Sequence, residues 1–332
     1  MVCDALKVAG LNPNWGLLGL MRFILAFIVL SEHLGWFLDI DPVLKITKFS
    51  ALVAVLSFLV ISGFSIAASY ESKTVGFYKR RALRIVPVYL IGIGFSLLVF
   101  HYLAGMQLVE NDLIVFPEIT IILGNVFFMQ GLVVGSLESN PIVWTLMIEV
   151  FFYVITPILN SKSKFFIPTI IVSALVFCSQ RYTGFQYYSQ MLYGLNIVYL
   201  GWAWLIGFWL YHHRRNIGAA FFALSLGIVA IAINGYFTPV FWSVTWVLTC
   251  AVVGYGHLIR LPFSFVAKLL GNISYPLYLL HIPLLYCLSI SGLPKNGVVY
   301  CFVVVVISLL VDLLIDRPFK IFCGFISNKN HY

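Results

Sequence analysis

The chain has 332 residues, of which 61% are hydrophobic and only 10% are charged. A soluble globular protein is nearer half apolar and a quarter charged, so the composition excludes an ordinary soluble protein. The net charge of +8 does not indicate a nucleic-acid partner, because the basic residues lie in short clusters between apolar segments, as in the cytoplasmic loops of membrane proteins. We expect one polytopic membrane domain over residues 1–332.

Apolar stretches long enough to cross a bilayer recur along the chain and predict an all-α fold. Ten candidate spans lie near residues 17–38, 48–69, 85–105, 143–159, 165–180, 191–211, 217–234, 238–257, 273–290 and 297–315. One further run, 118–134, is shorter and contains Gly124, Asn125 and Gln130. We expect about ten transmembrane helices and one short re-entrant or interfacial segment at 118–134.

The basic clusters support this count. They are FYKRRALR (77–84), SKSK (161–164), HHRR (212–215) and DRPFK (316–320). If 118–134 crossed fully, the last three clusters would fall outside, against the positive-inside rule. If it enters and returns, or lies in the interface, all four fall inside, and both termini are then expected to be cytoplasmic.

The first predicted span, LMRFILAFIVLSEHLGWF (20–37), carries Arg22, Glu32 and His33. Eleven residues make about three helical turns, so Arg22 and His33 share a face and lie roughly 16 Å apart along the axis. Ionisable groups at membrane depth face the bundle interior or water, so this face is predicted to line a cavity. The alternatives are an arginine that snorkels to the interface and a histidine bonded to a carbonyl.

The predicted span PIVWTLMIEVFFYVITP (141–157) places Glu149 in its middle, with Thr145 and Tyr153 one turn to either side. A carboxylate at membrane depth needs a cationic or histidine partner, or else it is protonated. Glu149 is therefore a candidate functional residue.

Two other segments carry polar side chains at helical spacing. In NISYPLYLLHIPLL (272–285) they are Ser274, Tyr278 and His281, a stripe that predicts either a direct role or a hydrogen-bonded helix seam. In LSFLVISGFSIAASY (56–70) they are Ser62, Ser65 and Ser69. In the second segment Gly63 allows close approach of a neighbouring helix, so we interpret these serines as packing residues.

The segment FYKRRALRIVP (77–87) places Arg81 and Arg84 on one face as the chain enters a helix. Planar guanidinium groups bind two phosphate oxygens at once, and Lys79 and Arg80 add attraction for an anion. An orientation signal or a site for anionic lipid headgroups is the alternative.

Together these motifs resemble acyltransferase family 3. They are R-x10-H from Arg22 to His33, SGF (62–64), RxxR at Arg81 and Arg84, W-[ST]-L-x-x-E from Trp144 to Glu149, ISYPLYLLH (273–281) and DRPFK (316–320). They follow the family's order over nearly the whole chain. Two positions depart from the family pattern: Leu56 stands where a polar or acidic residue is common, and Asp316 replaces the usual Glu.

The resemblance implies an integral-membrane O-acyltransferase of the bacterial inner membrane, which moves an acetyl or other acyl group from coenzyme A in the cytoplasm to a sugar hydroxyl. The implied acceptor is a surface polysaccharide such as lipopolysaccharide O-antigen, or its lipid-linked precursor. Arg22, Arg81 and Arg84 are expected to hold the phosphates of acetyl-CoA. His33 is expected to act as general base.

Glu149 is expected to orient His33, in preference to Glu32, which points about 100° away from the face of His33. The expected substrate pocket contains Trp144, Tyr278, His281 and Ser62. A covalent acyl intermediate on Ser62 or His33 is an alternative to direct transfer. The six cysteines contain no CxxC pair, and no metal is expected.

A transporter or flippase for a lipid-linked sugar is the main alternative function, because intramembrane charges and a re-entrant segment suit it equally well. A non-enzymatic membrane partner or sensor is a third. The sequence leaves the oligomeric state open.

Overall fold

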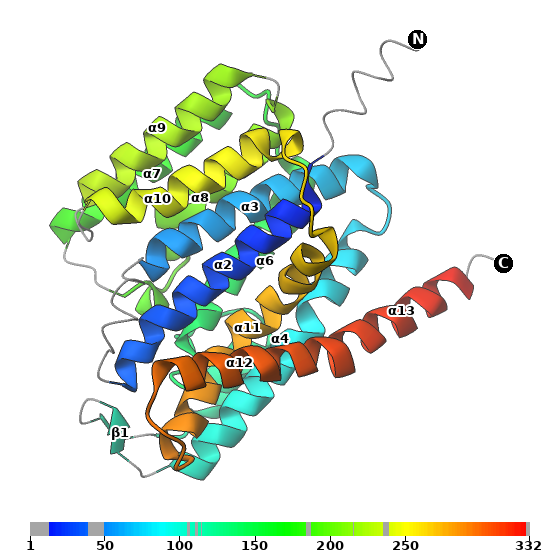
Figure 1. Ribbon diagram of the computed structural model, residues 1–332. Coiled ribbons are helices and arrows are strands. Elements are labelled where there is room, and N and C mark those ends of the chain that lie inside the picture. Colours follow the sequence, from blue (N-terminus) through cyan, green and yellow to red (C-terminus); the bar gives the residue numbers. More distant parts are fainter. Residues whose placement is uncertain are drawn as a thin grey trace.

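The computed structural model describes residues 13–38, 50–104, 107–109, 112–113, 115–183, 187–214, 216–234 and 239–329. These residues form an all-α bundle, with one small antiparallel ribbon made by β1 (Gln107–Val109) and β2 (Asp112–Leu113) (Figure 1). The predicted fold class is thereby confirmed.

The helices follow the predicted apolar runs, except α13, which lies beyond the last predicted span. They are α2 (Trp15–His33), α3 (Ala51–Ser72), α4 (Phe77–Leu103), α5 (Ile119–Val126), α6 (Trp144–Ile155), α7 (Phe166–Thr183), α8 (Leu195–His212), α9 (Ile217–Asn234), α10 (Pro239–Tyr255), α11 (Ser264–Ile290), α12 (Gly297–Val311) and α13 (Arg317–Lys329). Short turns of tighter helix occupy Leu34–Trp36, Pro141–Val143, Thr156–Ile158, Tyr188–Gln190 and Gly256–Leu258, and a π-helical turn, Asp312–Asp316, joins α12 to α13.

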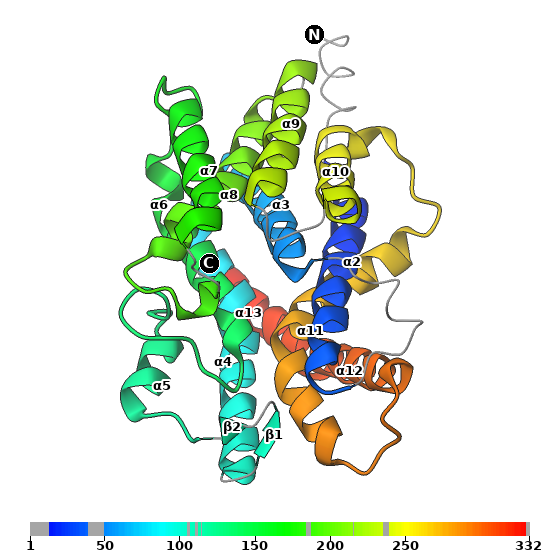
Figure 2. The ribbon, with the colours of Figure 1, turned by 90° about the vertical axis from the view of Figure 1, so that its left-hand side faces the viewer.

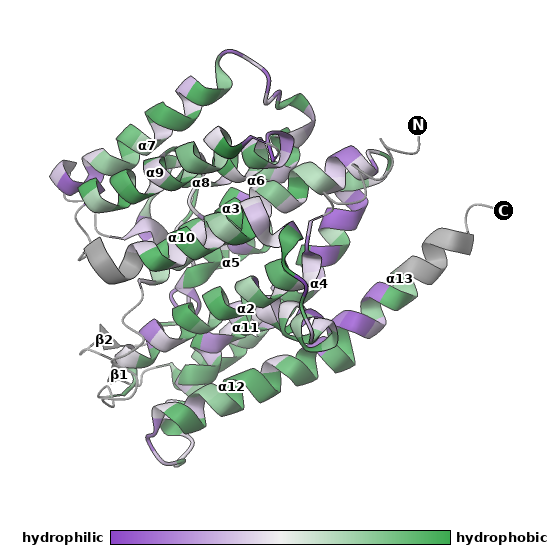
Figure 3. Cartoon of the chain, turned by 45° about the horizontal axis from the view of Figure 1, so that its top comes forward, coloured by the Kyte–Doolittle hydropathy of each residue, from purple (hydrophilic) through white to green (hydrophobic). Residues whose placement is uncertain are grey.

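Eight helical stretches in the described part of the chain are long and apolar enough to cross a membrane. They are Trp15–Trp36, Ala51–Ser72, Phe77–Leu103, Pro141–Ile158, Phe166–Thr183, Ile217–Asn234, Ser264–Ile290 and Gly297–Cys323. The other two predicted spans correspond to α8 and α10, helices of 18 and 17 residues. Hydrophobic residues cover most of these helices (Figure 3), and the chain is a multi-pass integral membrane protein.

The run 118–134 forms only the eight-residue helix α5 and a folded loop. At 1.5 Å per residue, α5 is about 12 Å long, too short to cross a bilayer. It lies beside α4 (Figure 2). The side chain of buried Asn125 donates to the carbonyls of Ile121 and Gly135, both at 2.9 Å. Such internal partners are what irregular backbone requires at membrane depth.

Helix α3 lies at the centre of the bundle, packed against α2, α8 and α10 (Figures 1 and 2). Its backbone touches that of α8 at two glycines. A Cβ atom at Gly63 would lie 2.0 Å from the carbonyl oxygen of Trp204, and one at Gly207 would lie 1.9 Å from that of Val60. The close approach predicted for Gly63 is confirmed: the backbones of α3 and α8 are in direct contact at these two glycines.

Three of the four basic clusters meet at one end of the bundle. The hydroxyl of Tyr78 donates to the carbonyl of Val154 at 3.0 Å, so the start of α4 meets the end of α6, just before SKSK (161–164). Lys79 and Lys320 line one outer cavity, which joins the DRPFK motif to the same end.

The described part of the remaining cluster, 212–214, lies at this end too. His213 shares a surface hollow with Tyr255 at the end of α10. Just beyond α10, the carbonyl of Ile259 accepts a 2.7 Å hydrogen bond from the side chain of Asn14, which caps the start of α2. We refer to this as the basic end, and the positive-inside rule predicts that it faces the cytoplasm.

Candidate active site

A cavity of about 100 Å³, the inner cavity, lies between α2, α3, α4, α6 and α11. Its polar lining comes from all five helices: Arg22, Ser62, Ser65, Arg81, Arg84, Thr145, Glu149, Tyr153, Ser274, Tyr275 and Tyr278. The inner cavity is therefore narrow, with these polar groups set among apolar side chains such as Phe58, Leu59 and Leu146.

A wider cavity of about 1160 Å³, the outer cavity, opens at the basic end. Its charged lining consists of Arg22, Lys79, Arg80, Arg84, Lys268, Lys320 and one carboxylate, Asp316. Four residues line both cavities: Arg22, Arg84, Ser274 and Tyr275. The two cavities therefore adjoin, and two arginines stand at the boundary between them.

The arginines have donors without acceptors. Arg81 Nη2 donates to the hydroxyl of Ser69 at 2.9 Å, but the buried Nε atoms of Arg22 and Arg81 have no hydrogen-bond partner. A buried donor without an acceptor costs free energy, and charge-assisted bonds to an oxyanion would satisfy it. Among the described lining residues of the inner cavity, Glu149 supplies the one carboxylate. The arginine side of the cavity is thus suited to an anion.

Glu149 is held by hydroxyl groups. Ser62 Oγ donates to Glu149 Oε1 at 2.8 Å, and the hydroxyl of Tyr153 donates to the same oxygen. The serine face of α3 thus differs from the interpretation above, because Ser62 and Ser65 line the cavity and Ser69 binds Arg81. The role of Glu149 in orienting His33 stays a prediction.

His33 lies at the end of α2 farther from the basic end. Its Nδ1 is 3.0 Å from Nε2 of His281 on α11. Arg22 and His33 belong to one continuous helix, as the sequence predicts. The prediction that their shared face lines a cavity holds for Arg22, which lines both cavities, but His33 lines neither of them. The neighbouring Glu32 is turned to α3, where its carboxylate accepts a hydrogen bond from the backbone N–H of Ala51. Glu32 therefore pairs with the first backbone N–H of α3, next to the N-cap residue Ser50.

Tyr278 connects the inner cavity to the histidine pair. Its hydroxyl lies 2.9 Å from Thr145 Oγ1 on α6, and its ring meets that of His281 edge to face with centroids 6.1 Å apart. Trp144, one residue before Thr145, stacks on Tyr188 at 5.6 Å and does not line either cavity described above. Roles for Trp144, Tyr278, His281 and Ser62 in substrate binding stay predictions.

A family model described as an acyltransferase domain, that of acyltransferase family 3, matches residues 16–317. The chain belongs to acyltransferase family 3. Membership implies acyltransferase activity and an acyl donor. No curated protein and no solved structure matches the chain at a significant level. Within the described residues of this acyltransferase, no group of three or more His, Cys, Asp or Glu side chains is placed to hold a metal ion.

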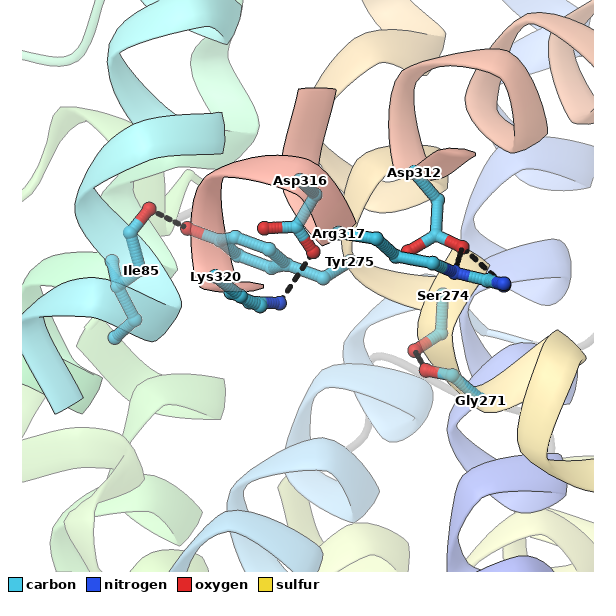
Figure 4. Close-up of polar contacts among 8 residues, drawn as sticks. All are labelled: Ile85, Gly271, Ser274, Tyr275, Asp312, Asp316, Arg317 and Lys320. Atoms are coloured by element: carbon cyan, nitrogen blue, oxygen red, sulfur yellow. Dashed lines mark hydrogen bonds and ion pairs between the residues drawn. The ribbon is translucent and has the colours of Figure 1, made fainter. Parts of the chain in front are cut away.

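The structure adds lining residues that sequence reasoning missed. Tyr275 lines both cavities, and its hydroxyl donates to the carbonyl of Ile85 on α4 at 3.0 Å (Figure 4). Lys268 extends the basic lining of the outer cavity. Lys268 lies before the predicted span 273–290, in residues that form the first turns of α11, whereas Tyr275 lies within that span, in the motif ISYPLYLLH.

Two ion pairs that involve the closing DRPFK motif join α13 to the π-helical turn before it. Asp312 binds Arg317 at 2.6 Å, and Asp316 binds Lys320 (Figure 4). Both carboxylates are buried, with 1% and 2% of the side chain exposed, at the junction between α12 and α13. The pair at Asp316 places Lys320 in the lining of the outer cavity.

Arg317→Ala is expected to destabilise the acyltransferase more than Asp312→Asn, because it leaves a buried carboxylate without its partner. We expect a loss of about 2 kcal/mol, below the usual figure for a buried pair because Arg317 is partly exposed. Adding Asp312→Asn to Arg317→Ala should recover part of the loss. Thermal unfolding in detergent checks this; equal melting temperatures for Arg317→Ala and wild type would contradict it.

Proposed function

We propose that this acyltransferase moves an acetyl or other acyl group from acyl-CoA, bound at the basic end, to a hydroxyl of a carbohydrate. The proposed acceptor is a bacterial surface polysaccharide such as O-antigen, or its lipid-linked precursor, and the proposed location is the bacterial inner membrane. The observation that carries the proposal is the pair of buried guanidinium donors, on Arg22 and Arg81, where the outer cavity narrows to the inner one.

The shapes of the two cavities support an acyl-CoA donor. Such a donor has phosphates and a nucleotide at one end and a thioester on a long thin arm. The outer cavity is of the size that binds organic ligands, and its lining is strongly basic. The inner cavity is narrow, and His33 lies roughly 16 Å along α2 from Arg22. Arg22, Arg81 and Arg84 would hold phosphate oxygens while the arm extends inward.

His33 supplies the proposed chemistry. A sugar hydroxyl becomes an effective nucleophile when a base removes its proton as it attacks the thioester carbonyl. In this step the new C–O bond forms, the C–S bond breaks, and His33 receives the hydroxyl proton. It then returns that proton to the departing thiolate. An imidazole suits both transfers near neutral pH.

A covalent route has one supporting observation, the hydrogen bond from Ser62 to Glu149. Glu149 would take the Ser62 proton while the hydroxyl attacks the thioester. We prefer direct transfer because Glu149 Oε1 also accepts a hydrogen bond from Tyr153. A label that stays on the protein without acceptor, and is lost in Ser62→Ala, would favour the covalent route.

A transporter or flippase for a lipid-linked sugar is the alternative. It requires a binding site near the middle of the membrane that opens to each side in turn. It gives no reason for a basic outer cavity that adjoins a narrow inner one with unpaired guanidinium donors, so the acyl-transfer proposal accounts for more of the structure.

Arg81→Ala and Arg84→Ala are expected to weaken donor binding by about tenfold or more each, because charge-assisted hydrogen bonds contribute about 1.5–3 kcal/mol. Lysine at either position should rescue binding in part, since an ammonium group lacks the two-pronged geometry. Binding of non-hydrolysable acyl-CoA to the purified protein measures the effect. Arg181→Ala, on an exposed side chain at the end of α7, is the control. Unchanged affinity in both variants would argue against the phosphate site.

A further inference from the structure

We infer that His281 is a positioning residue, which fixes the tautomer of His33 so that Nε2 of His33 is the basic nitrogen. The inference rests on the proposed function in one respect, that His33 is the base. The observation that carries it is the hydrogen bond between His33 Nδ1 and His281 Nε2, 3.0 Å long, between two helices that are far apart in sequence.

The first step concerns the proton on His281. Its Nδ1 faces two backbone carbonyl oxygens, those of Tyr278 at 2.8 Å and Leu277 at 3.2 Å. A carbonyl oxygen only accepts hydrogen bonds, so Nδ1 of His281 carries the proton. The side chain is fully buried, and no carboxylate is among its described partners. A second proton on this ring would be a buried unpaired charge, so His281 is neutral and its Nε2 holds a lone pair.

The second step concerns His33. Because His281 Nε2 accepts, the nitrogen opposite it must donate, and that nitrogen is His33 Nδ1. With its proton on Nδ1, neutral His33 has its lone pair on Nε2.

The third step concerns the orientation of the ring. The rings of His33 and His281 stack with centroids 5.1 Å apart, and Trp36 meets His33 edge to face at 4.4 Å. The backbone that holds His281 is that of Tyr278, whose hydroxyl is fixed by Thr145 on α6. Both the tautomer and the orientation of His33 are therefore set by α11 and its contact with α6.

His281 would fix the tautomer and the ring orientation of His33, as the carboxylate of a hydrolase triad does for the catalytic histidine. A general base must present a bare nitrogen to the hydroxyl it deprotonates. If the proton of neutral His33 moved to Nε2, that nitrogen would become a donor. Loss of His281 as acceptor should therefore lower the rate of acyl transfer without weakening donor binding, since neither histidine lines the cavity that contains Arg22, Arg81 and Arg84.

The tautomer is read directly in the wild-type protein. Nitrogen-15 spectra of histidine-labelled enzyme separate a protonated ring nitrogen from a bare one, and His33→Gln identifies the His33 signals by their disappearance. We expect a bare Nε2 and a protonated Nδ1 at His33. A neutral His33 protonated at Nε2 in the active wild type would overturn the inference.

Two variants of His281 test the consequence. His281→Leu removes the acceptor at similar volume, and we expect about 10²-fold lower kcat with the KM for acyl-CoA within about twofold. His281→Gln keeps a carbonyl oxygen near the position of Nε2 and should retain more activity than the leucine variant. Equal kcat in His281→Leu and wild type would contradict the inference. Full transfer by His33→Ala would instead contradict the base assignment of the proposed function.

Discussion

His33→Ala is expected to abolish acyl transfer while acyl-CoA still binds. General-base catalysis raises the reaction rate by a factor of about 10²–10⁴, so kcat should fall by about 10²-fold or more. Donor affinity should stay near the wild-type value, because Arg22, one of the proposed phosphate-binding arginines, lies roughly 16 Å away along α2, and the other two lie near it on α4. Single-turnover transfer from labelled acetyl-CoA and a separate binding measurement with a non-hydrolysable analogue give the two quantities.

The matched control for His33→Ala is His101→Ala. His101 also lies near the far end of a membrane helix, in the last turn of α4, but its side chain is exposed and contacts Phe116. It should leave transfer unchanged. Retention of full transfer by His33→Ala, with wild-type expression, would remove His33 from the proposed chemistry and would leave the acyl-CoA site standing.

Gly207→Val is expected to prevent α3 and α8 from packing and to leave little folded protein. Even a Cβ atom at Gly207 would lie 1.9 Å from the Val60 carbonyl oxygen and 2.7 Å from its carbon. These are backbone atoms, so no side-chain rotation relieves the clash and the helices must separate. Overpacking of a core usually costs about 1–3 kcal/mol, and separating two backbones should cost more. Yield after size-exclusion chromatography in detergent and the melting temperature measure the loss.

The matched control is Gly94→Val, in a membrane helix at a site where an added Cβ meets no atom within 4 Å. That variant should fold normally. Because α3 carries Ser62 and Ser65 into the inner cavity, any Gly207→Val protein that folds should also bind acyl-CoA more weakly. Normal yield and melting temperature for Gly207→Val would contradict the direct backbone contact between α3 and α8.

The spans were predictable because hydropathy is local: an apolar run long enough to cross a bilayer must bond its backbone internally, which favours a helix. Where a helix extends into polar residues beyond the apolar run, the hydropathy pattern predicts a helix that is too short. Helix α4 begins at Phe77 rather than near residue 85, and α11 begins at Ser264 rather than near residue 273. Those added turns carry four of the six basic residues that line the outer cavity: Lys79, Arg80, Arg84 and Lys268.

The side-chain pairs of the site were less predictable, because they join segments far apart in the chain. The spacing of Arg22 and His33 is visible on one helix. The partner of His33 comes from His281, 248 residues later, and Ser62 and Glu149 are 87 residues apart. Helical periodicity shows on which face of its own helix a polar residue lies, but not which neighbouring helix that face contacts. For the same reason, the serines of α3 were interpreted as packing residues.

Acyl transfer in proteoliposomes tests the central claim most directly, that acyl-CoA bound at the basic end donates its acyl group. Purified protein, reconstituted with a known orientation, is supplied with labelled acetyl-CoA on one side only and with a lipid-linked glycan. Label should reach the glycan only when acetyl-CoA is on the side that carries residues 161–164. Movement of intact glycan across the bilayer with the thioester unconsumed, or transfer from the opposite side alone, would contradict the claim.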